Sequence, residues 1–235
     1  MSSEDIIMDF NVNEWLDLLM HHIRETFGER LVFAGHTGSF VRGEASENSD
    51  IDVNVILDKV DIEDLIAYRQ IVKKMPLSKK ACGFISSVRE IKAWPRHELF
   101  HFINGCRVLH GNIFDLIDGP DKRDIIDYIR NSSSAILHET RHKMIYSEDY
   151  DPDSLEFSYK NVFFILQASL FLKLNRFILT KKEMLSAFYD DRDRAVLEIN
   201  INWNKLEEDR FIRPEYYFIT LIEWCSKTLV ETQTY

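Results

Sequence analysis

The chain has 235 residues, enough for one large domain or two small ones with hydrophobic cores. Hydrophobic residues make up 45% of it and the formal net charge is −10, which indicates a folded protein and excludes one that wraps nucleic acid with its whole surface. The three cysteines lie far apart without a Cys-x-x-Cys pair, and neither a signal-peptide pattern nor a membrane-spanning apolar run is found, so we expect a cytoplasmic protein.

The first half of the chain alternates between helix and strand patterns. In two segments the apolar residues recur every three or four positions, which is typical of helices that bury one face. Shorter apolar runs bounded by glycine or polar residues read as strands. The predicted helices cover residues 11–30 and 61–75, and the predicted strands cover residues 31–35, 50–57, 82–88 and 106–111.

The second half of the chain has only helix patterns. Strand signals stop after Gly111, and an apolar segment with Phe and Leu on nearly all sides predicts a central bundle helix. The sequence therefore predicts an α+β protein, with a small mixed-sheet domain over residues 1–115 and an all-helical bundle domain over residues 116–235. The predicted bundle helices cover residues 119–146, 151–175, 180–188 and 214–231.

Two aspartates lie where the predicted strand 50–57 begins. Side chains alternate along a strand, so Asp50 and Asp52 share one face, about 6.6–6.8 Å apart. Two like charges repel each other unless a cation lies between them. Mg²⁺ prefers oxygen ligands and is held by one or two carboxylates together with substrate phosphates, and a pair of such ions can serve an in-line displacement. We therefore predict that Asp50 and Asp52 bind Mg²⁺, as two ions.

A Gly-Ser pair precedes the aspartates by about ten residues. Gly38 would let the backbone approach a phosphate, and the Ser39 hydroxyl and the amides after it would bind phosphate oxygens. Arg42 would add a planar fork for a terminal phosphate. His36 lies close to this loop, and either a cleft-lining role or a packing role fits its position.

The stretch GSFVRGEASENSDID, residues 38–52, resembles the motif of the nucleotidyltransferase superfamily that includes DNA polymerase beta, in particular its minimal bacterial members and the aminoglycoside nucleotidyltransferases. The resemblance implies a nucleoside triphosphate donor, Mg²⁺, transfer of a nucleoside monophosphate and release of pyrophosphate. It implies that Ser39 and Arg42 hold the outer phosphates and that Asp50 and Asp52 are the catalytic metal ligands. The matching residues are Gly38, Ser39, Arg42, Gly43, Ser49, Asp50 and Asp52.

Three further residues are candidates through the same resemblance. The family has a third metal-binding carboxylate on a neighbouring strand, and we expect Glu90 to close that strand, the alternative being a solvated strand-end glutamate. In kanamycin-modifying relatives, the first long helix of the bundle supplies a glutamate as general base and a lysine four residues later. Glu156 and Lys160 have this spacing, and Lys160 would neutralise the α-phosphate. The alternative is a surface ion pair.

The segment HELFH, residues 97–101, offers a competing function. It matches the H-E-x-x-H pattern of zinc peptidases, in which both histidines share a helix face. The helix must fit between Pro95 and Gly105, and the third ligand of the longer pattern is missing. We therefore favour a packing helix that buries Leu99 and Phe100.

The sequence leaves several possibilities for the compound that accepts the nucleotide. The acidic balance of the chain favours a small cationic hydroxyl compound such as an aminoglycoside. The alternatives are transfer to a protein side chain or an RNA end, and a non-catalytic, antitoxin-like member of the fold. Nucleic acid is not expected as a partner, because the lysine pairs are too short to form a binding patch. A homodimer is implied only by resemblance, since relatives often bind the acceptor between two subunits.

Overall fold

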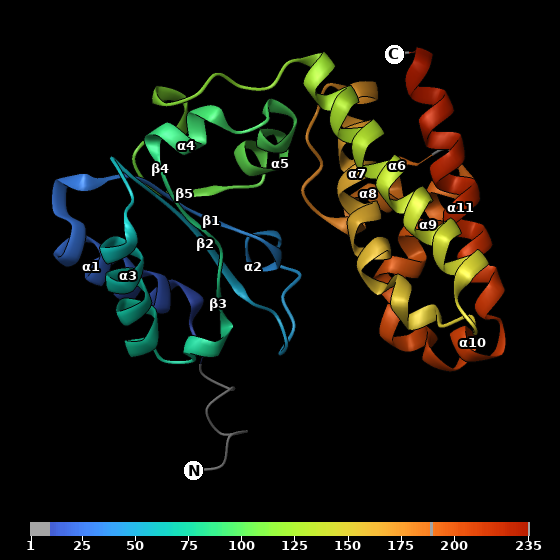
Figure 1. Ribbon diagram of the computed structural model, residues 1–235, viewed down its shortest axis with the longest axis horizontal. Helices are drawn as coiled ribbons and strands as arrows, with labels where there is room; N and C mark the ends of the chain where they lie inside the picture. Colours follow the sequence, from blue (N-terminus) through green and yellow to red (C-terminus); the bar gives the residue numbers. More distant parts are fainter. Residues whose placement is uncertain (1–9, 189, 235) are drawn as a thin grey trace, which may run out of the picture. The chain divides into compact units, whose positions relative to one another are not determined.

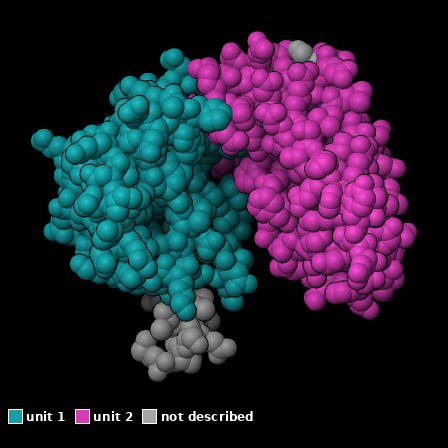
Figure 2. Space-filling view, viewed as in Figure 1, with its two compact units in different colours: residues 1–95, 101–119 teal, residues 96–100, 120–235 magenta. Residues whose placement is uncertain are grey.

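The computed structural model describes residues 10–188 and 190–234, and the chain divides into two compact units (Figures 1 and 2). The αβ unit comprises Met1–Pro95 and His101–Gly119, and the helical unit comprises Arg96–Phe100 and Pro120–Tyr235. The chain thus passes into the helical unit, returns, and enters it again. The predicted domains differ from this division by the short segment Arg96–Phe100 and by the four residues before Pro120.

A mixed five-stranded sheet forms the centre of the αβ unit (Figure 1). The second strand runs antiparallel to the first and parallel to the third and fourth, which follow one another along its other edge. The fifth strand runs antiparallel to the first. This architecture confirms the predicted α+β class. The strands are β1 (Leu31–Thr37), β2 (Ile51–Leu57), β3 (Ala81–Cys82), β4 (Ile85–Ser87) and β5 (Arg107–His110).

The single strand predicted over residues 82–88 is divided in two at Gly83. This glycine has a φ of +117°, and a Cβ atom there would lie 2.1 Å from the carbonyl oxygen of Val53. The backbone therefore leaves the extended conformation between β3 and β4. Ser87 then caps a helix, α4 (Val88–Ala93), so the strand does not continue to Glu90 as predicted.

Helices cover the sheet of the αβ unit on both faces. The helices predicted over residues 11–30 and 61–75 are α1, which begins after Asn11 and ends at Gly28, and α3, which begins after Asp61. They pack on the face formed by Ile51, Val53 and other alternate residues of β2. On the opposite face Phe33 meets Phe102 and Phe84 meets Trp94. The remaining bounds are α1 (Val12–Phe27), α2 (Ser39–Arg42), α3 (Ile62–Lys74) and α5 (Leu99–Asn104).

The helical unit is a bundle in which α7 is the most buried helix. Four of its helices were predicted, but α9 and α10 were not. Most of their residues are polar, and the short apolar cluster around Val196 and Leu197 gives too weak a helix pattern. The helix predicted from Asp151 begins as α7 only at Glu156, after the 3-10 turn Pro152–Leu155. The helices are α6 (Lys122–Tyr146), α7 (Glu156–Leu174), α8 (Lys181–Ala187), α9 (Asp191–Asn202), α10 (Glu207–Ile212) and α11 (Pro214–Glu231).

The core of the helical unit contains one residue from the short returning segment. Phe100 is 1% exposed, and its ring packs against Phe171 and Phe177 at centroid distances of 5.1 and 5.6 Å. Arg96 of the same segment donates a hydrogen bond of 2.9 Å to Asp124 on α6. Within the described ranges, every helix is too short or too polar to cross a membrane.

Candidate functional site

The two aspartates lie at the start of β2. Asp52 is its second residue, and Asp50 immediately precedes the strand. Because Val53 packs into the core beneath α1 and α3, its neighbours Asp52 and Asn54 point to the other face of the sheet. Thr37 is the partner of Asp52 on β1, and it accepts a hydrogen bond of 3.1 Å from Asn54. One end of this sheet face is therefore polar.

Negative charge accumulates at this end of the sheet. Asp50 is exposed and Asp52 is half-buried. Burial raises the pKa of Asp52 above its ordinary value, and the charge of Asp50 raises it as well. The neighbouring Cys82 thiol and the positive charge of Arg42 act in the opposite direction and lower the pKa of Asp52. The carboxylate pair is thus held together at an electrostatic cost that a bound cation would relieve.

The backbone of Gly38 lies directly against the Asp52 carboxylate. A Cβ atom on Gly38 would lie 2.0 Å from Oδ2 of Asp52, and the glycine has a φ of +83°. Gly38 immediately precedes the short helix α2, which starts at Ser39. Only glycine fits both the backbone conformation and the close approach. The structure thus brings the Gly-Ser pair and the second aspartate together, as the motif predicts.

The other residues of the motif make contacts within their own loop. Nε of Arg42 donates a hydrogen bond of 2.9 Å to Oε2 of Glu44. The Ser49 hydroxyl accepts a hydrogen bond of 2.8 Å from the amide of Ser46 and so shapes the loop that leads to Asp50. The phosphate-binding roles of Ser39, Arg42 and Ser49 stay predictions.

Two residues in and just before β3 also lie at this site, and sequence reasoning missed both. Cys82 is the register partner of Asp52 in the parallel pair of β2 and β3, so its thiol and that carboxylate lie on the same face of the sheet. Nζ of Lys80 donates to the backbone carbonyls of Glu47 and Ser49. No sequence signal identifies them, because the contact depends on which strand pairs with β2.

Glu90 is not brought to the aspartates. In the parallel pair of β2 and β4, Ser87 lies beside Leu57, at the end of β2 remote from Asp52. Oε2 of Glu90 accepts hydrogen bonds of 2.7 Å from the amide and the hydroxyl of Ser87, which completes a capping box at the start of α4. Glu90 is therefore accounted for by helix capping, and its geometry does not support the predicted third metal ligand.

Glu156 and Lys160 form an ion pair on the surface of the helical unit. Nζ of Lys160 lies 2.7 Å from Oε1 of Glu156, and the two side chains are 64% and 46% exposed. The two residues lie four positions apart on α7, as predicted. This contact is the surface ion pair named as the alternative, and their roles as base and phosphate ligand stay predictions.

The remaining histidine patterns receive packing explanations. The HELFH segment is split between the 3-10 turn Arg96–Glu98 and α5, so it is not one continuous helix, and Leu99 and Phe100 are buried as predicted. His36 pairs with Val53 and therefore lies on the sheet face opposite Asp52. It packs in the αβ unit and does not line the carboxylate site.

His36 is also buried without a hydrogen bond. It is 1% exposed, and neither ring nitrogen has a partner within the described residues. Burial, with a smaller contribution from the positive charge of Arg107, lowers the pKa of His36 to about 4. The imidazole is therefore neutral at ordinary pH.

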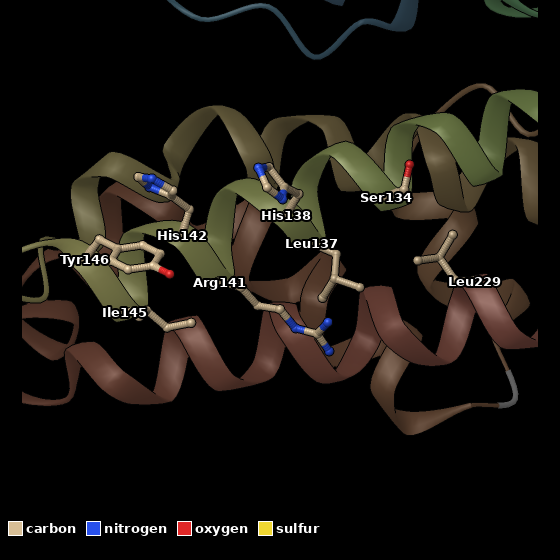
Figure 3. A pocket seen from close by; sticks show the side chains of 8 residues that line it. All are labelled: Ser134, Leu137, His138, Arg141, His142, Ile145, Tyr146 and Leu229. Atoms are coloured by element: carbon tan, nitrogen blue, oxygen red, sulfur yellow. The ribbon is translucent and has the colours of Figure 1, made fainter.

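A separate surface cavity of about 320 Å³ lies on the helical unit (Figure 3). His138 and His142 project from the same side of α6, with ring centroids 6.4 Å apart, and the ring of Tyr146 lies 4.9 Å from that of His142. Leu229 of α11 contributes to its lining. None of the predicted site residues lines it.

The carboxylate pair fits a hard divalent cation. Among the described residues, no group of three or more His, Cys, Asp and Glu side chains is arranged to hold a metal ion. Asp50 and Asp52 nevertheless supply oxygen donors and excess negative charge next to a loop that leaves no room for a side chain at Gly38. Mg²⁺ commonly takes only one or two protein carboxylates and completes its shell with water and phosphate oxygens.

One solved structure shares the fold along nearly the whole of this chain. The spectinomycin adenyltransferase AAD(9) from Enterococcus faecialis, solved with ATP and spectinomycin, has a similar fold, with a TM-score of 0.59 and 15% identity over 93% of this chain and 99% of that chain. A toxin–antitoxin structure with AMP-PNP matches with a TM-score of 0.31 and 17% identity over 55% of this chain and 93% of that chain. No curated protein sequence matches the chain.

The family comparison covers the part of the chain that holds the carboxylate pair. Residues 22–98 match the family model of the nucleotidyltransferase domain. This range includes β1, the Gly-Ser loop and the start of β2, and so contains the whole motif of residues 38–52. The predicted class of enzyme is confirmed: the chain contains a nucleotidyltransferase domain over residues 22–98.

Proposed function

We propose that the protein transfers a nucleoside monophosphate from a nucleoside triphosphate to a hydroxyl group of a small acceptor and releases pyrophosphate. The observation that carries this proposal is the placement of Asp50 and Asp52 at one end of the sheet, with the backbone of Gly38 against Asp52. The nucleotidyltransferase domain supports it, as does the similarity in fold to an adenyltransferase along nearly the whole of both chains.

The reaction is an in-line displacement at the α-phosphorus. The acceptor hydroxyl oxygen forms a bond to the α-phosphorus while the bond to the bridging oxygen of the β-phosphate breaks, and pyrophosphate leaves with that oxygen. Mg²⁺ held by Asp50 and Asp52 would supply charge neutralisation for the triphosphate. The hydroxyl proton passes to a base, the role predicted for Glu156, and Lys160 is predicted to bind the α-phosphate.

A small cationic acceptor fits the net charge of −10 and the spectinomycin bound to the structural relative. We therefore propose an aminoglycoside-like compound in preference to a protein side chain or an RNA end. A homodimer stays a prediction from resemblance.

A non-catalytic, antitoxin-like role is the second candidate. The observation that favours it is the missing third carboxylate, because no described acidic group joins Asp50 and Asp52 and Glu90 caps α4. Such a protein would retain nucleotide binding at most, without turnover.

A nucleotide screen followed by an acceptor screen tests these functions. Thermal unfolding is measured with each of the four nucleoside triphosphates, with and without Mg²⁺, because a ligand that binds the folded state raises the midpoint. Pyrophosphate release is then measured with a panel of aminoglycosides and spectinomycin. Release that depends on one of these compounds supports the enzyme. Label from α-³²P nucleotide in protein or RNA favours a macromolecular acceptor, and nucleotide binding without release under any condition favours the non-catalytic role.

A further inference from the structure

Beyond the motif residues, the short segment Lys80–Cys82 lies beside Asp52 and contacts the loop that leads to Asp50. We propose that this segment positions the carboxylate pair, with Cys82 orienting the Asp52 carboxylate and Lys80 fixing the loop that leads to Asp50. Both would be positioning residues for the metal-binding carboxylates, so the inference rests on the proposed function.

Cys82 restrains Asp52 from the side of β3. The two residues are register partners, so the thiol lies on the same face of the sheet as the carboxylate and can donate a hydrogen bond to it. Gly38 closes another side of the same carboxylate. The Asp52 side chain is thereby restricted between a backbone that leaves no free space and a hydrogen-bond donor.

The chemistry of the donor suits a metal-binding carboxylate. A thiol is a weak, neutral donor, whereas an arginine or lysine in its place would bring a positive charge. Cys82 can therefore orient Asp52 without cancelling the negative charge that a cation needs. Its exposed position also means that its removal opens no cavity in the core.

Lys80 acts on the loop that ends at Asp50. Its ammonium group donates to the backbone carbonyls of Glu47 and Ser49, the second contact measuring 3.4 Å. The Ser49 carbonyl belongs to the peptide plane that leads into Asp50, so holding this oxygen limits the direction in which Asp50 projects. The Ser46–Ser49 hydrogen bond limits the same turn from within.

The test measures cation binding directly, with Mn²⁺ as a paramagnetic substitute for Mg²⁺. Free Mn²⁺ is quantified by electron paramagnetic resonance during titration of the full-length protein in the presence of α,β-methylene ATP. Asp52→Asn provides the reference for loss of the site. The variants are Cys82→Val and Cys82→Ser, of which only serine keeps a donor, and Lys80→Met and Lys80→Arg, of which only arginine keeps the cation.

We expect Cys82→Val and Lys80→Met each to weaken Mn²⁺ affinity by about tenfold, the range seen when a partner of a metal ligand is removed. Cys82→Ser and Lys80→Arg should restore affinity to within about threefold of the wild type, which a merely structural role would not require. Lys79→Met is the matched control, because Lys79 is the adjacent exposed lysine, and it should bind Mn²⁺ like the wild type.

Two results separate this inference from the proposed function. If the wild type and Cys82→Val bind Mn²⁺ equally, or if Lys80→Met behaves like Lys79→Met, the corresponding positioning role is overturned while the function stands. If the wild type binds no Mn²⁺ with nucleotide, the proposed function is overturned and this inference with it. Unfolding midpoints measured without metal show whether each variant folds. If Cys82→Val or Lys80→Met does not fold, the conservative variant at the same position decides. Wild-type Mn²⁺ affinity in that variant supports the positioning role, and a tenfold loss overturns it.

Discussion

A side chain on Gly38 would collide with Asp52, because its Cβ atom would lie 2.0 Å from Oδ2 of that carboxylate. Gly38→Ala must therefore displace either the loop or the metal ligand. We expect transfer activity to fall by about a hundredfold, since a displacement of about 1 Å at a reacting group has this effect. The measurement is the rate of pyrophosphate release at saturating Mg²⁺ and nucleotide.

Gly43→Ala is the control for Gly38→Ala. Gly43 also has a positive φ, +68°, but a Cβ atom there would meet nothing within 4 Å. Gly43→Ala should lose about 1 kcal/mol of unfolding free energy through backbone strain, and Gly38→Ala should lose more because the collision with Asp52 adds to the strain. Only Gly38→Ala should lose activity through Asp52, and equal losses in the two variants would contradict this explanation.

Asp52→Asn should abolish transfer without weakening the fold. The pKa of Asp52 is raised by burial and by Asp50, so its negative charge is unfavourable in the folded protein at neutral pH when no cation is bound. We therefore expect an unchanged or higher unfolding midpoint in EDTA, and no rise in the midpoint when Mg²⁺ and nucleotide are added. A variant that keeps its turnover would remove Asp52 from the metal site.

Stability should fall on acidification because of His36. Its folded-state pKa is about 4, below the ordinary value of 6.5, so between these values the unfolded state binds more protons. The contribution is fully present above pH 6.5 and is lost as the pH falls toward 4. Down to pH 4.5, which still lies above the folded-state value, we expect a loss of about 2 kcal/mol, since one pKa unit corresponds to about 1.4 kcal/mol.

His36→Leu isolates this effect from the titration of carboxylates. Urea unfolding of both proteins at pH 7 and pH 4.5 gives the two differences in unfolding free energy. The wild type should lose about 2 kcal/mol more than His36→Leu between these pH values. Equal losses would show that protonation of His36 does not drive the acid sensitivity.

Glu156→Gln separates a surface ion pair from a general base. The pair with Lys160 is exposed, so the change in unfolding free energy should stay below about 0.5 kcal/mol. If Glu156 accepts the hydroxyl proton, transfer should fall by about 10²–10⁴-fold. Glu139→Gln is matched to it, because Glu139 and Lys143 form another i,i+4 pair in the same unit, 2.6 Å apart. Equal activities of the two variants would leave Glu156 without a catalytic role.

The sequence predicted the features whose signals are local. The helices predicted over residues 11–30, 61–75 and 180–188 are present, and Asn11, Asp61 and Thr180 cap their starts. The Gly-Ser loop and the alternation along β2 placed Asp52 correctly. These features depend on backbone conformation and side-chain period within a few residues.

The features that the sequence did not predict depend on tertiary pairing. Glu90 was expected at the end of a strand, but Gly83 broke that strand against the backbone of Val53, and the resulting turn made Glu90 a capping residue. Lys80 and Cys82 became neighbours of the aspartates only because β3 pairs with the start of β2. No local pattern carries that register.

The returning segment Arg96–Phe100 means that the helical unit, excised as the continuous peptide 120–235, lacks part of its own core. Cleavage after Gly119 would separate Phe100 from Phe171 and Phe177. The C-terminal fragment would then contain a hole the size of a phenyl ring, and such losses cost about 3–5 kcal/mol. The N-terminal fragment would expose the same ring to water. Fragment complementation, with both pieces expressed together, is therefore the form in which a divided chain should recover its fold.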